Sequence, residues 1–549
     1  MKRNIFCFLL LALLTVAIFS ELYNRENSLS YSIGYNLYGA ERVLDGEIPY
    51  RDFHTLYPPA IVYLNAAIFK LFGITLLNAL FTVMLFKVGT TLVIYLCARR
   101  MLPISWSLVV AAFSLIWLRP NGPFKAVPMH YGALFLALAL FFLLSKRLNG
   151  SLILSAGIAL GVLTLFKHNI GAYAVLATLA SFLVDETSKK FSIRYFFTSL
   201  KPITWLLIGV ALPVLPTLFF IWSKGALRQM IAALLFGPGE FLLNRLAAAP
   251  MPFIPLGFAV LLGIFLLMMN KVKAQPVIST AISLIAVLLI AGCSLVGKQS
   301  WVDALIFYLP VFTIIAGLLF VVYASRFEFA NQRAGLLVTL FTAAALMEAF
   351  PRFAREQAIA AMPFVALLLL FLLFNFRPLI EKFIGANLNL KMTLAILPLL
   401  LFVMGARLFA QTFFDRALRF KSTTELAIAR GRGVYFPAEK AAEIDQVTSY
   451  LRERVPEGGY FFAESYAGSS FLFLADRNNP SGAQFWGGVG VKERERIETL
   501  EALKREDVQV IVTNSRDLEA EKYPPMREFI NQNFKLTRQF GDVQILEKH

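Results

Sequence analysis

Long apolar runs separated by short polar breaks fill residues 5–408 of the chain. Each run has about 15–24 residues, which is near the length that an α-helix needs to cross a bilayer at roughly 1.5 Å per residue. We therefore expect about thirteen membrane-spanning helices. Their expected ranges are 5–20, 74–97, 104–118, 130–144, 151–166, 170–184, 203–222, 253–269, 276–295, 304–323, 335–348, 359–375 and 392–408.

Two apolar runs need a closer look. Lys2 and Arg3 precede the first run as they do in a signal peptide, but Phe19 stands where a cleavage site needs a small residue. We therefore expect an uncleaved first helix. The second run, 59–72, is short and begins at the Pro58-Pro59 pair. It is either a helix on the membrane surface or the start of a longer second span.

The pattern changes near residue 409, where charged and apolar residues begin to mix as in a soluble domain. We predict helices over 438–454, 491–505 and 525–534, strands over 459–463 and 508–513, and a terminal hairpin over 535–547 around Gly541-Asp542. The predicted fold is an α-helical polytopic membrane protein. Its two parts are a transmembrane domain at 1–408, with a first outer loop at 21–58, and a small C-terminal α/β domain at 409–549.

Composition agrees with this division. Of the 549 residues, 58% are hydrophobic and 16% are charged, and the mean hydropathy is +0.66. A soluble chain is about half apolar and about a quarter charged, so a single water-soluble core, a disordered chain and a disulfide-stapled secreted domain are excluded. Three cysteines lie far apart in apolar runs without metal-ligand spacing, and we interpret them as small hydrophobic residues: Cys7, Cys97 and Cys293.

The net charge of +17, from 52 Lys and Arg against 35 Asp and Glu, indicates how the chain is oriented. Basic residues gather in every second loop, where acids are few, and such loops face the cytoplasm. The N-terminus is then cytoplasmic, and an odd number of spans places 409–549 outside. Since the chain has no basic stripe with interleaved aromatic residues, nucleic acid is not an expected partner.

Acidic residues are nearly absent from the expected spans but crowd the first outer loop. Transporters that couple to protons or sodium usually carry carboxylates near the middle of the membrane. The pattern therefore favours a binding or reaction site at the outer surface over a pathway through the membrane. Within this loop we predict a helix that ends at Gly46, an extended stretch over 49–53, and then the Pro58-Pro59 pair.

The run ERVLDGEIPYRDFHTLYPPAIVYLNAAIFKLFG at 41–73 resembles the first periplasmic loop of GT-C-type membrane glycosyltransferases. These are bacterial relatives of protein O-mannosyltransferases and of the aminoarabinose transferase that acts on lipid A. The tail is similar too, through Arg-Gly-x-Gly at 430–433 and FGDVQILE at 540–547. The resemblance implies a multi-pass protein of the bacterial cytoplasmic (inner) membrane that moves a sugar from a polyprenyl-phosphate carrier to an acceptor outside.

The sequence departs from this family at two places. Many members carry an Asp-Glu pair before the L-x-G of the loop, where this chain has Ser32 and Ile33. The second departure is at 350–357, where the family's Asp and His are missing and Arg352 is retained. The base that takes the acceptor proton, an effect of typically about 10²–10⁴-fold, must then be another acid. We predict, in this order, Asp52, Glu41, Glu21 and Asp45.

A phosphate leaving group keeps its charge, so Arg or Lys must meet it at the level of the lipid headgroups. Lys167 and His168 lie between two apolar spans with almost no loop around them; the simpler interpretation is a lysine that reaches to the membrane surface. For Arg51 the simpler interpretation is an ion pair with Asp52. The predicted substrate-binding residues are Arg51, His54, Tyr57, Lys167, His168, Arg352 and Arg355.

Two other functions stay open. One is a transporter or flippase of lipid-linked glycans, and the other is a non-catalytic GT-C-like protein that binds a glycan. The expected partners are a polyprenyl-phosphate donor, a glycan, lipid or protein acceptor, and membrane lipids. No cofactor is implied beyond the lipid-linked sugar donor. A divalent metal ion is not indicated by any spacing of ligands, although acids of the first loop could bind one.

Overall fold

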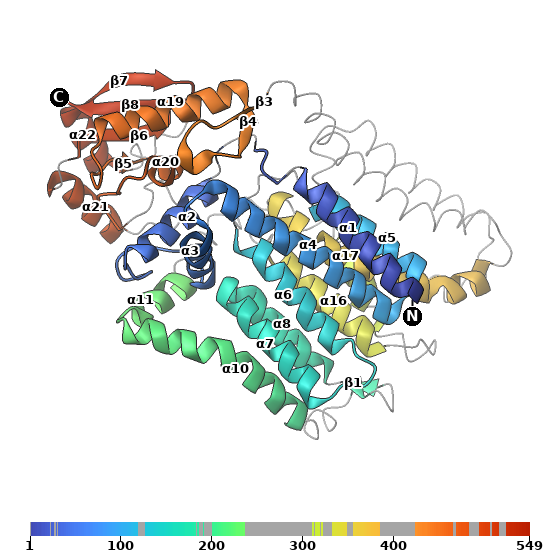
Figure 1. Ribbon diagram of the computed structural model, residues 1–549. Coiled ribbons are helices and arrows are strands. Elements are labelled where there is room, and N and C mark those ends of the chain that lie inside the picture. The colour runs from blue at the N-terminus through green and yellow to red at the C-terminus, as the bar shows by residue number, and fades with distance from the viewer. Residues whose placement is uncertain are drawn as a thin grey trace.

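The computed structural model shows a helical bundle with the C-terminal region packed on one end (Figure 1). We call this end of the bundle, which contacts residues 423–549, the capped end, and the opposite end the open end. The described residues are 2–21, 23–26, 29, 31–118, 127–182, 184–185, 190–191, 200–236, 310–311, 313–318, 320–321, 332–348, 355–384, 423–464, 468–482, 493–505, 508–514 and 523–549.

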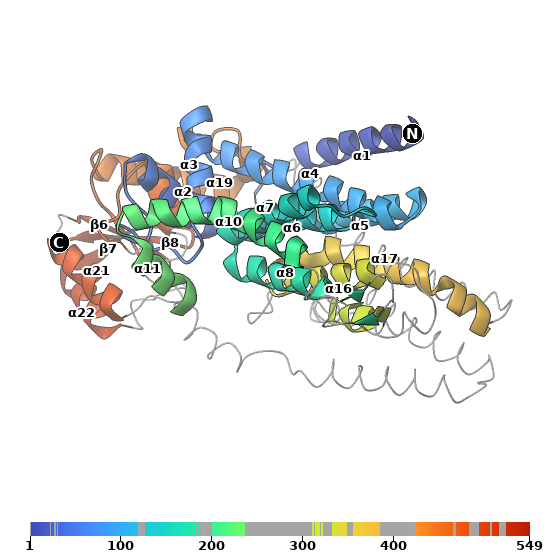
Figure 2. The same ribbon diagram turned by 90° about the horizontal axis from the view of Figure 1, so that it is seen from below.

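Nine long helices form the described part of the bundle: α1 (Lys2–Ser20), α4 (Leu76–Met101), α5 (Ile104–Leu118), α6 (Pro128–Leu143), α7 (Gly150–Phe166), α8 (His168–Ser181), α10 (Leu200–Ser223), α16 (Gln332–Leu346) and α17 (Arg355–Ile384). Each overlaps an expected span. α1 lies on one side of the bundle and α16 on the other, with α4, α5 and α6 between them (Figure 2). The short strands β1 (Val184–Asp185) and β2 (Lys190–Phe191) pair beyond α8.

By length and composition, three of the described helices are long and apolar enough to cross a membrane, over Leu76–Met101, Leu200–Ser223 and Ala358–Asn375. Shorter apolar helices accompany them, including Gly150–Phe166 and Gln332–Leu346. The spans expected at 253–269, 276–295 and 392–408 lie outside the described residues, and 304–323 is described only in part.

Three shorter helices and a π-helical segment lie at the capped end: α2 (Tyr31–Leu44), α3 (Ala60–Phe72), α11 (Leu227–Ile231) and η1 (Ala232–Phe236). α3 settles the interpretation of residues 59–72. The chain reverses after it at Gly73, whose φ of 94° is one that glycine adopts readily. α4 then begins separately, because the Thr75 side chain caps it by accepting a hydrogen bond from the Asn78 amide at 3.2 Å. α3 is therefore a helix of its own.

α7 and α10 approach each other closely because both carry glycine at the crossing. A Cβ atom on Gly157 of α7 would overlap the carbonyl oxygen of Leu206, and one on Gly209 of α10 would overlap that of Leu154. Gly161 continues the same face of α7, four residues later, against Val210. This spacing of small residues lets helix backbones touch in a membrane, where van der Waals packing drives association.

The C-terminal region folds around a four-stranded sheet in the order β5-β6-β8-β7. β5 and β6 are parallel and the other pairs are antiparallel. Its elements are β3 (Thr423–Glu425), η3 (Ala429–Gly431), β4 (Tyr435–Pro437), α19 (Ala438–Arg454), β5 (Phe462–Ala463), α20 (Gly468–Ala475), α21 (Glu493–Arg505), β6 (Val510–Asn514), α22 (Pro524–Asn533), β7 (Phe534–Phe540) and β8 (Val543–Lys548). The predicted helix at 438–454, the buried strand near 508–513 and the terminal hairpin are confirmed.

The two faces of this sheet pack against different partners. Val510 and Val512 of β6 join a core with α19, α20 and the capped end of the bundle. Ile511, which points the other way, joins a core with α21 and α22. One hydrophobic core therefore runs from the bundle into the C-terminal region, and the two predicted domains share an apolar interior.

The first outer loop is built into this junction. The amide of Glu26 donates to the carbonyl of Tyr435 at 2.8 Å, and the amide of Tyr435 donates to that of Asn24 at 2.8 Å. Farther along the loop, α2 packs so closely on α20 that a Cβ atom on Gly34 would overlap the backbone of Ser470. The C-terminal region thus contacts the first outer loop at two places, at residues 24–26 and at Gly34 of α2.

Candidate functional site

The segment between α2 and α3 forms a tight turn, so the prediction of an extended stretch over 49–53 is wrong. The carbonyl of Ile48 accepts the amide of Asp52 at 2.9 Å, and the amide of Tyr50 donates to the carbonyl of Phe53 at 2.8 Å. Tyr50 has a φ of 70°, a left-handed conformation that costs energy for a bulky side chain. The Asp52 carboxylate closes the turn by accepting the Ile48 amide at 2.7 Å.

Asp52 is occupied by contacts on both of its carboxylate oxygens. Arg51 donates to Oδ1 and to Oδ2, each at 2.8 Å, and also reaches the carbonyl of Lys224 beyond α10 at 3.2 Å. The hydrogen bonds from Arg51 hold the pKa of Asp52 below its usual range. Asp52 is therefore ionised at neutral pH and closes the turn. Arg51 forms the ion pair that was its simpler interpretation and joins the turn to the residue after α10.

Glu41 lies in the junction between α2 and the C-terminal region. Its Oε1 is 2.5 Å from Nη2 of Arg430, which is also 2.6 Å from Oδ1 of Asp476. Arg430 comes from the Arg-Gly-x-Gly motif and is buried, donating to the carbonyl of Phe473 at 2.6 Å. Burial raises the pKa of Glu41 to about 7, helped by the nearby Asp476 and opposed by Arg430. Burial likewise raises the pKa of Asp45.

Glu21 and His54 occupy different places. Glu21 is exposed where α1 ends at the capped end. The His54 amide donates to the carbonyl of Gly482 at 2.9 Å, so the loop runs against the C-terminal region at this point. The His54 carbonyl in turn accepts the hydroxyl of Tyr35 at 3.3 Å.

Lys167 stands where three segments far apart in the sequence converge. It interrupts the helix between α7 and α8, with φ −149° and ψ 90°. Its Nζ is 3.2 Å from Oε2 of Glu348, just after α16, and 5.2 Å from the centre of the Tyr57 ring of the first loop. The side chains of Lys167 and Glu348 are 18% and 6% exposed. The structure thus brings together Tyr57 and Lys167, as predicted substrate-binding residues, with an acid.

Polar atoms around this pair have unused hydrogen-bonding capacity. His168 Nδ1, Asn169 Oδ1 and Glu348 Oε2 are buried and form no hydrogen bond with the described residues. The contact of Glu348 with Lys167 is thus an ion pair that lacks hydrogen-bond geometry. Buried polar groups are normally satisfied in folded proteins, so such a cluster is typical of a site that a ligand completes.

Sequence reasoning did not single out Glu348. Glu348 is the last residue of the expected span 335–348, where a polar residue at the membrane surface is ordinary. The one feature of the sequence that could have pointed to it is its place just before the motif around Arg352. Arg352 itself lies outside the described residues. Arg355 begins α17, and its side chain also lies outside what the structure describes.

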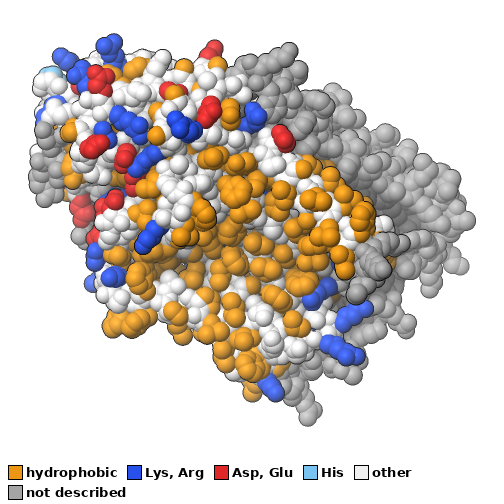
Figure 3. All heavy atoms as spheres, in the orientation of Figure 1, with side chains coloured by type: hydrophobic (Ala, Val, Ile, Leu, Met, Phe, Trp, Pro, Cys, Tyr) orange, Lys and Arg blue, Asp and Glu red, His pale blue; other side chains and the backbone are white. Residues whose placement is uncertain are grey.

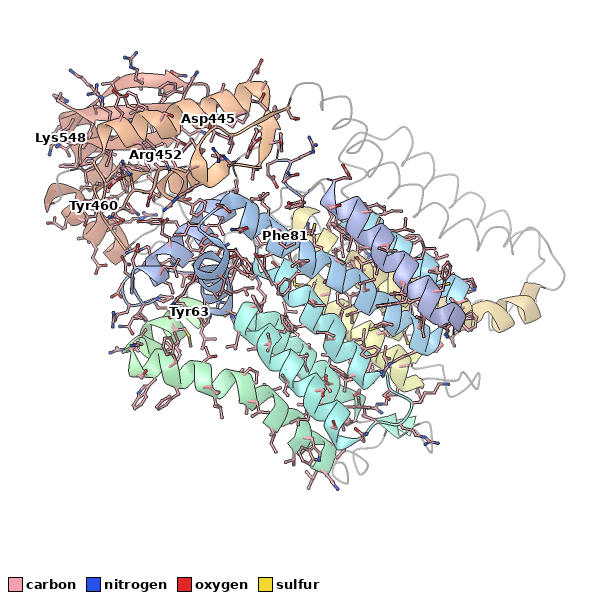
Figure 4. The ribbon with its side chains drawn as sticks, viewed as in Figure 1. Tyr63, Phe81, Asp445, Arg452, Tyr460 and Lys548 are labelled. Atoms are coloured by element: carbon pink, nitrogen blue, oxygen red, sulfur yellow. The ribbon has the colours of Figure 1, made fainter. Side chains whose placement is uncertain are left out.

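A cavity of about 380 Å³ lies between α3, α7 and α10. Its wall and the Lys167 cluster share two chain segments, since Leu165 is two residues before Lys167 and Pro59 is two residues after Tyr57. Tyr63, on α3 (Figure 4), contacts Phe220 of α10 edge-on at 5.7 Å. Its hydroxyl is buried and has no hydrogen-bond partner among the described residues. The cavity is lined by Pro59, Ala60, Tyr63, Leu165, Pro216, Thr217 and Phe220.

The face of the molecule shown in Figure 3 has a broad hydrophobic band between two charged zones. Basic and acidic side chains mix over the C-terminal region, whereas basic ones mark the open end in this view. The band includes exposed side chains of α10, such as Leu215 and Phe219, at 60% and 65% exposure. Such a band matches the apolar interior of a bilayer.

The described residues contain no group of three or more His, Cys, Asp or Glu side chains that could hold a metal ion. Three acids of the first loop are paired with arginines, in the ion pairs Arg42–Glu47, Arg51–Asp52 and Arg430–Glu41.

Comparison with known proteins finds similarity at the level of structure alone. No protein-family model and no curated protein matches the sequence. The archaeal oligosaccharyltransferase AglB from Archaeoglobus fulgidus, solved with an inhibitory peptide and a dolichol-phosphate, is similar at 15% identity and a TM-score of 0.46, over 96% of this chain and 71% of that one.

ArnT from Cupriavidus metallidurans is similar at 12% identity. The match covers 99% of this chain and 98% of that one in the apo state, with a TM-score of 0.43. With undecaprenyl phosphate bound, it covers 100% and 98%, with a TM-score of 0.39. AglB and ArnT are both GT-C glycosyltransferases, the family that the first loop resembles.

Proposed function

We propose that this protein is a membrane glycosyltransferase that transfers a sugar from a polyprenyl-phosphate donor to an acceptor at the outer face of the bacterial cytoplasmic membrane. The observation that carries the proposal is the Lys167 ammonium group at the capped end, whose side chain is 18% exposed and which contacts the buried Glu348. A lysine with so little exposure between two apolar helices of a membrane protein is costly, and such residues usually serve a substrate or ion.

The arrangement matches the two halves of a lipid phosphate. The cavity between α3, α7 and α10 offers apolar walls for an isoprenoid chain. Lys167 offers up to three N–H donors and a positive charge to the phosphate. The Tyr57 ring lies against the ammonium group at 5.2 Å and orients it by a cation–π contact. Arg51, His54, His168, Arg352 and Arg355 stay predicted substrate-binding residues.

The chemistry needs a cation more than it needs a general acid. As the bond between the sugar C1 and the phosphate oxygen breaks, negative charge grows on the phosphate, and a fixed cation there stabilises the transition state more than the ground state. The acceptor hydroxyl loses its proton to a base. The loop 48–57, held by α2 and by the C-terminal region, forms one side of the space where these groups meet.

The test is sugar transfer by the purified protein in liposomes that contain a polyprenyl-phosphate-linked sugar. We expect Lys167→Gln to lower transfer by about 10²–10³-fold, the usual effect of removing one group that stabilises the transition-state charge. Lys70→Gln is the matched control, because Lys70 is an exposed lysine on α3.

Thermal unfolding establishes that both variants are folded. Full transfer by folded Lys167→Gln would contradict the proposal. Movement of a lipid-linked glycan across the bilayer without any covalent product would favour the flippase instead.

A further inference from the structure

The acid that contacts Lys167 is not one of those that the loop motif indicates. We propose that Glu348 is released from Lys167 when the donor phosphate binds, and that its carboxylate then takes the proton of the acceptor hydroxyl. This proposal rests on the proposed function and assigns the base of the same site.

The Lys167–Glu348 pair is suited to exchange. A buried ion pair is stable only when its geometry is good and its remaining hydrogen bonds are made. Here the two groups are 3.2 Å apart, but Oε2 of Glu348 forms no hydrogen bond with the described residues. A phosphate that binds Lys167 replaces the carboxylate as its partner. The Glu348 carboxylate then has lost its cation and has an oxygen available for the proton of the acceptor hydroxyl.

Three other predicted bases are either held by arginines or lie away from Lys167. Asp52 uses both oxygens for Arg51 and the Ile48 amide. Glu41 is joined to Arg430 in the junction with the C-terminal region. Glu21 is exposed at the end of α1. Among the described residues, Glu348 is the acid in contact with the proposed phosphate-binding cation.

The step is balanced as follows. The acceptor oxygen forms a bond to C1 of the sugar while the bond between C1 and the phosphate oxygen breaks. The electron pair of the broken bond leaves with that oxygen, and the lipid phosphate gains one negative charge. The acceptor proton moves to the Glu348 carboxylate, which becomes a neutral carboxyl group. Charge and protons are conserved, and Lys167 stays protonated beside the departing phosphate.

The helix that precedes Glu348 is held in place by contacts with its neighbours. Thr342, two turns earlier on α16, donates to the Phe364 carbonyl of α17 at 3.2 Å and to the Val338 carbonyl of its own helix at 2.7 Å. Gly335 of the same helix packs against Phe320 and Phe371. α16 is therefore fixed to its neighbours below the site, and the carboxylate that follows it has a defined place.

The experiment compares donor binding and transfer in three variants of the full-length protein. Binding of undecaprenyl phosphate is measured in nanodiscs, and transfer from a polyprenyl-phosphate-linked sugar is measured in liposomes. We expect Glu348→Gln to bind the lipid at least as tightly as the wild type, because Lys167 loses a competing anion. We expect its transfer to fall by about 10²–10⁴-fold, the range for loss of a general base.

Two further variants separate the explanations. Asp52→Asn should keep transfer within about tenfold of the wild type, since this carboxylate positions the turn and does not take the proton. Glu348→Asp keeps the charge and shortens the side chain, so it should recover part of the transfer that Glu348→Gln loses. This variant also serves if Glu348→Gln fails to fold.

The outcomes distinguish this inference from the proposed function. If Lys167→Gln abolishes lipid binding and Glu348→Gln transfers sugar at the wild-type rate, Glu348 is not the base and only the inference fails. Loss of transfer in Asp52→Asn with full transfer in Glu348→Gln would assign the base to Asp52. If the wild type neither binds undecaprenyl phosphate nor transfers sugar, the proposed function fails.

Discussion

Burial decides which acids of this protein change charge near neutral pH. Glu41 and Asp52 come from the same loop, eleven positions apart, yet their pKa values shift in opposite directions. Asp52 is partly exposed and accepts two hydrogen bonds from Arg51, which stabilise its charged form. Glu41 is 8% exposed, and desolvation outweighs its pairing with Arg430. In the sequence the two residues are similar acids, and only their surroundings in the folded protein give them different pKa values.

The raised pKa of Glu41 predicts a pH-dependent stability. Because the folded protein binds this proton more tightly than the unfolded chain, the neutral carboxyl favours folding at low pH, and this contribution is lost as pH rises. Relative to Glu41→Gln, which is always neutral, we expect the wild type to lose about 3 kcal/mol of unfolding free energy as pH rises from 4.5 to about 7. Thermal unfolding of both proteins in detergent measures it, and a pH-independent difference would contradict it.

At the scale of elements, the helices follow from local patterns. The capping Thr75 and Asn149 side chains begin α4 and α7, and the apolar runs set the lengths of both helices. Their packing is a different matter. α7 is apolar all round, so periodicity does not say which face meets α10, and the glycine contacts decide it.

Because α7 and α10 cross so closely, we predict that a larger side chain at the crossing lowers the stability of the protein. Gly157→Leu places a side chain where the Leu206 carbonyl lies, so the helices must separate. We expect about 1–3 kcal/mol of lost stability, as in other overpacked interiors, seen as a lower unfolding temperature in detergent. Ile158→Phe adds bulk to the next residue, which is 37% exposed. Equal effects of the two substitutions would argue against the glycine contact.

At the scale of the whole molecule, the C-terminal region is part of the site's support. Phe473 of α20 stacks on Phe69 of α3 with ring centres 5.7 Å apart and carries Arg430 above its ring. The same region contacts the first outer loop through the Gly482 carbonyl, which accepts the His54 amide, and through the Asn479 backbone amide, which donates to the Tyr38 hydroxyl at 2.8 Å. The C-terminal region, whose sequence resembles that of a separate soluble domain, thus packs against the bundle as part of the capped end.

The proposed orientation predicts which residues face each side of the membrane. Lys535 is exposed on β7 of the C-terminal region, and Lys146 is exposed at the open end after α6. In a cysteine-free background, a membrane-impermeant thiol reagent should label Lys535→Cys in spheroplasts and Lys146→Cys only after the membrane is broken. Labelling of Lys146→Cys alone in intact spheroplasts would invert the proposed topology.

The sequence by itself determined the class of this protein, the positions of most of the described helices, the terminal hairpin and a loop rich in candidate site residues. These features depend on hydrophobic length, period and turn chemistry, which are local properties of the chain. Tertiary structure alone decided that Lys167 meets Glu348, that Glu41 meets Arg430 and that Asp52 closes a turn. Those contacts join residues up to 389 positions apart, and their charges are set by burial, which no local pattern contains.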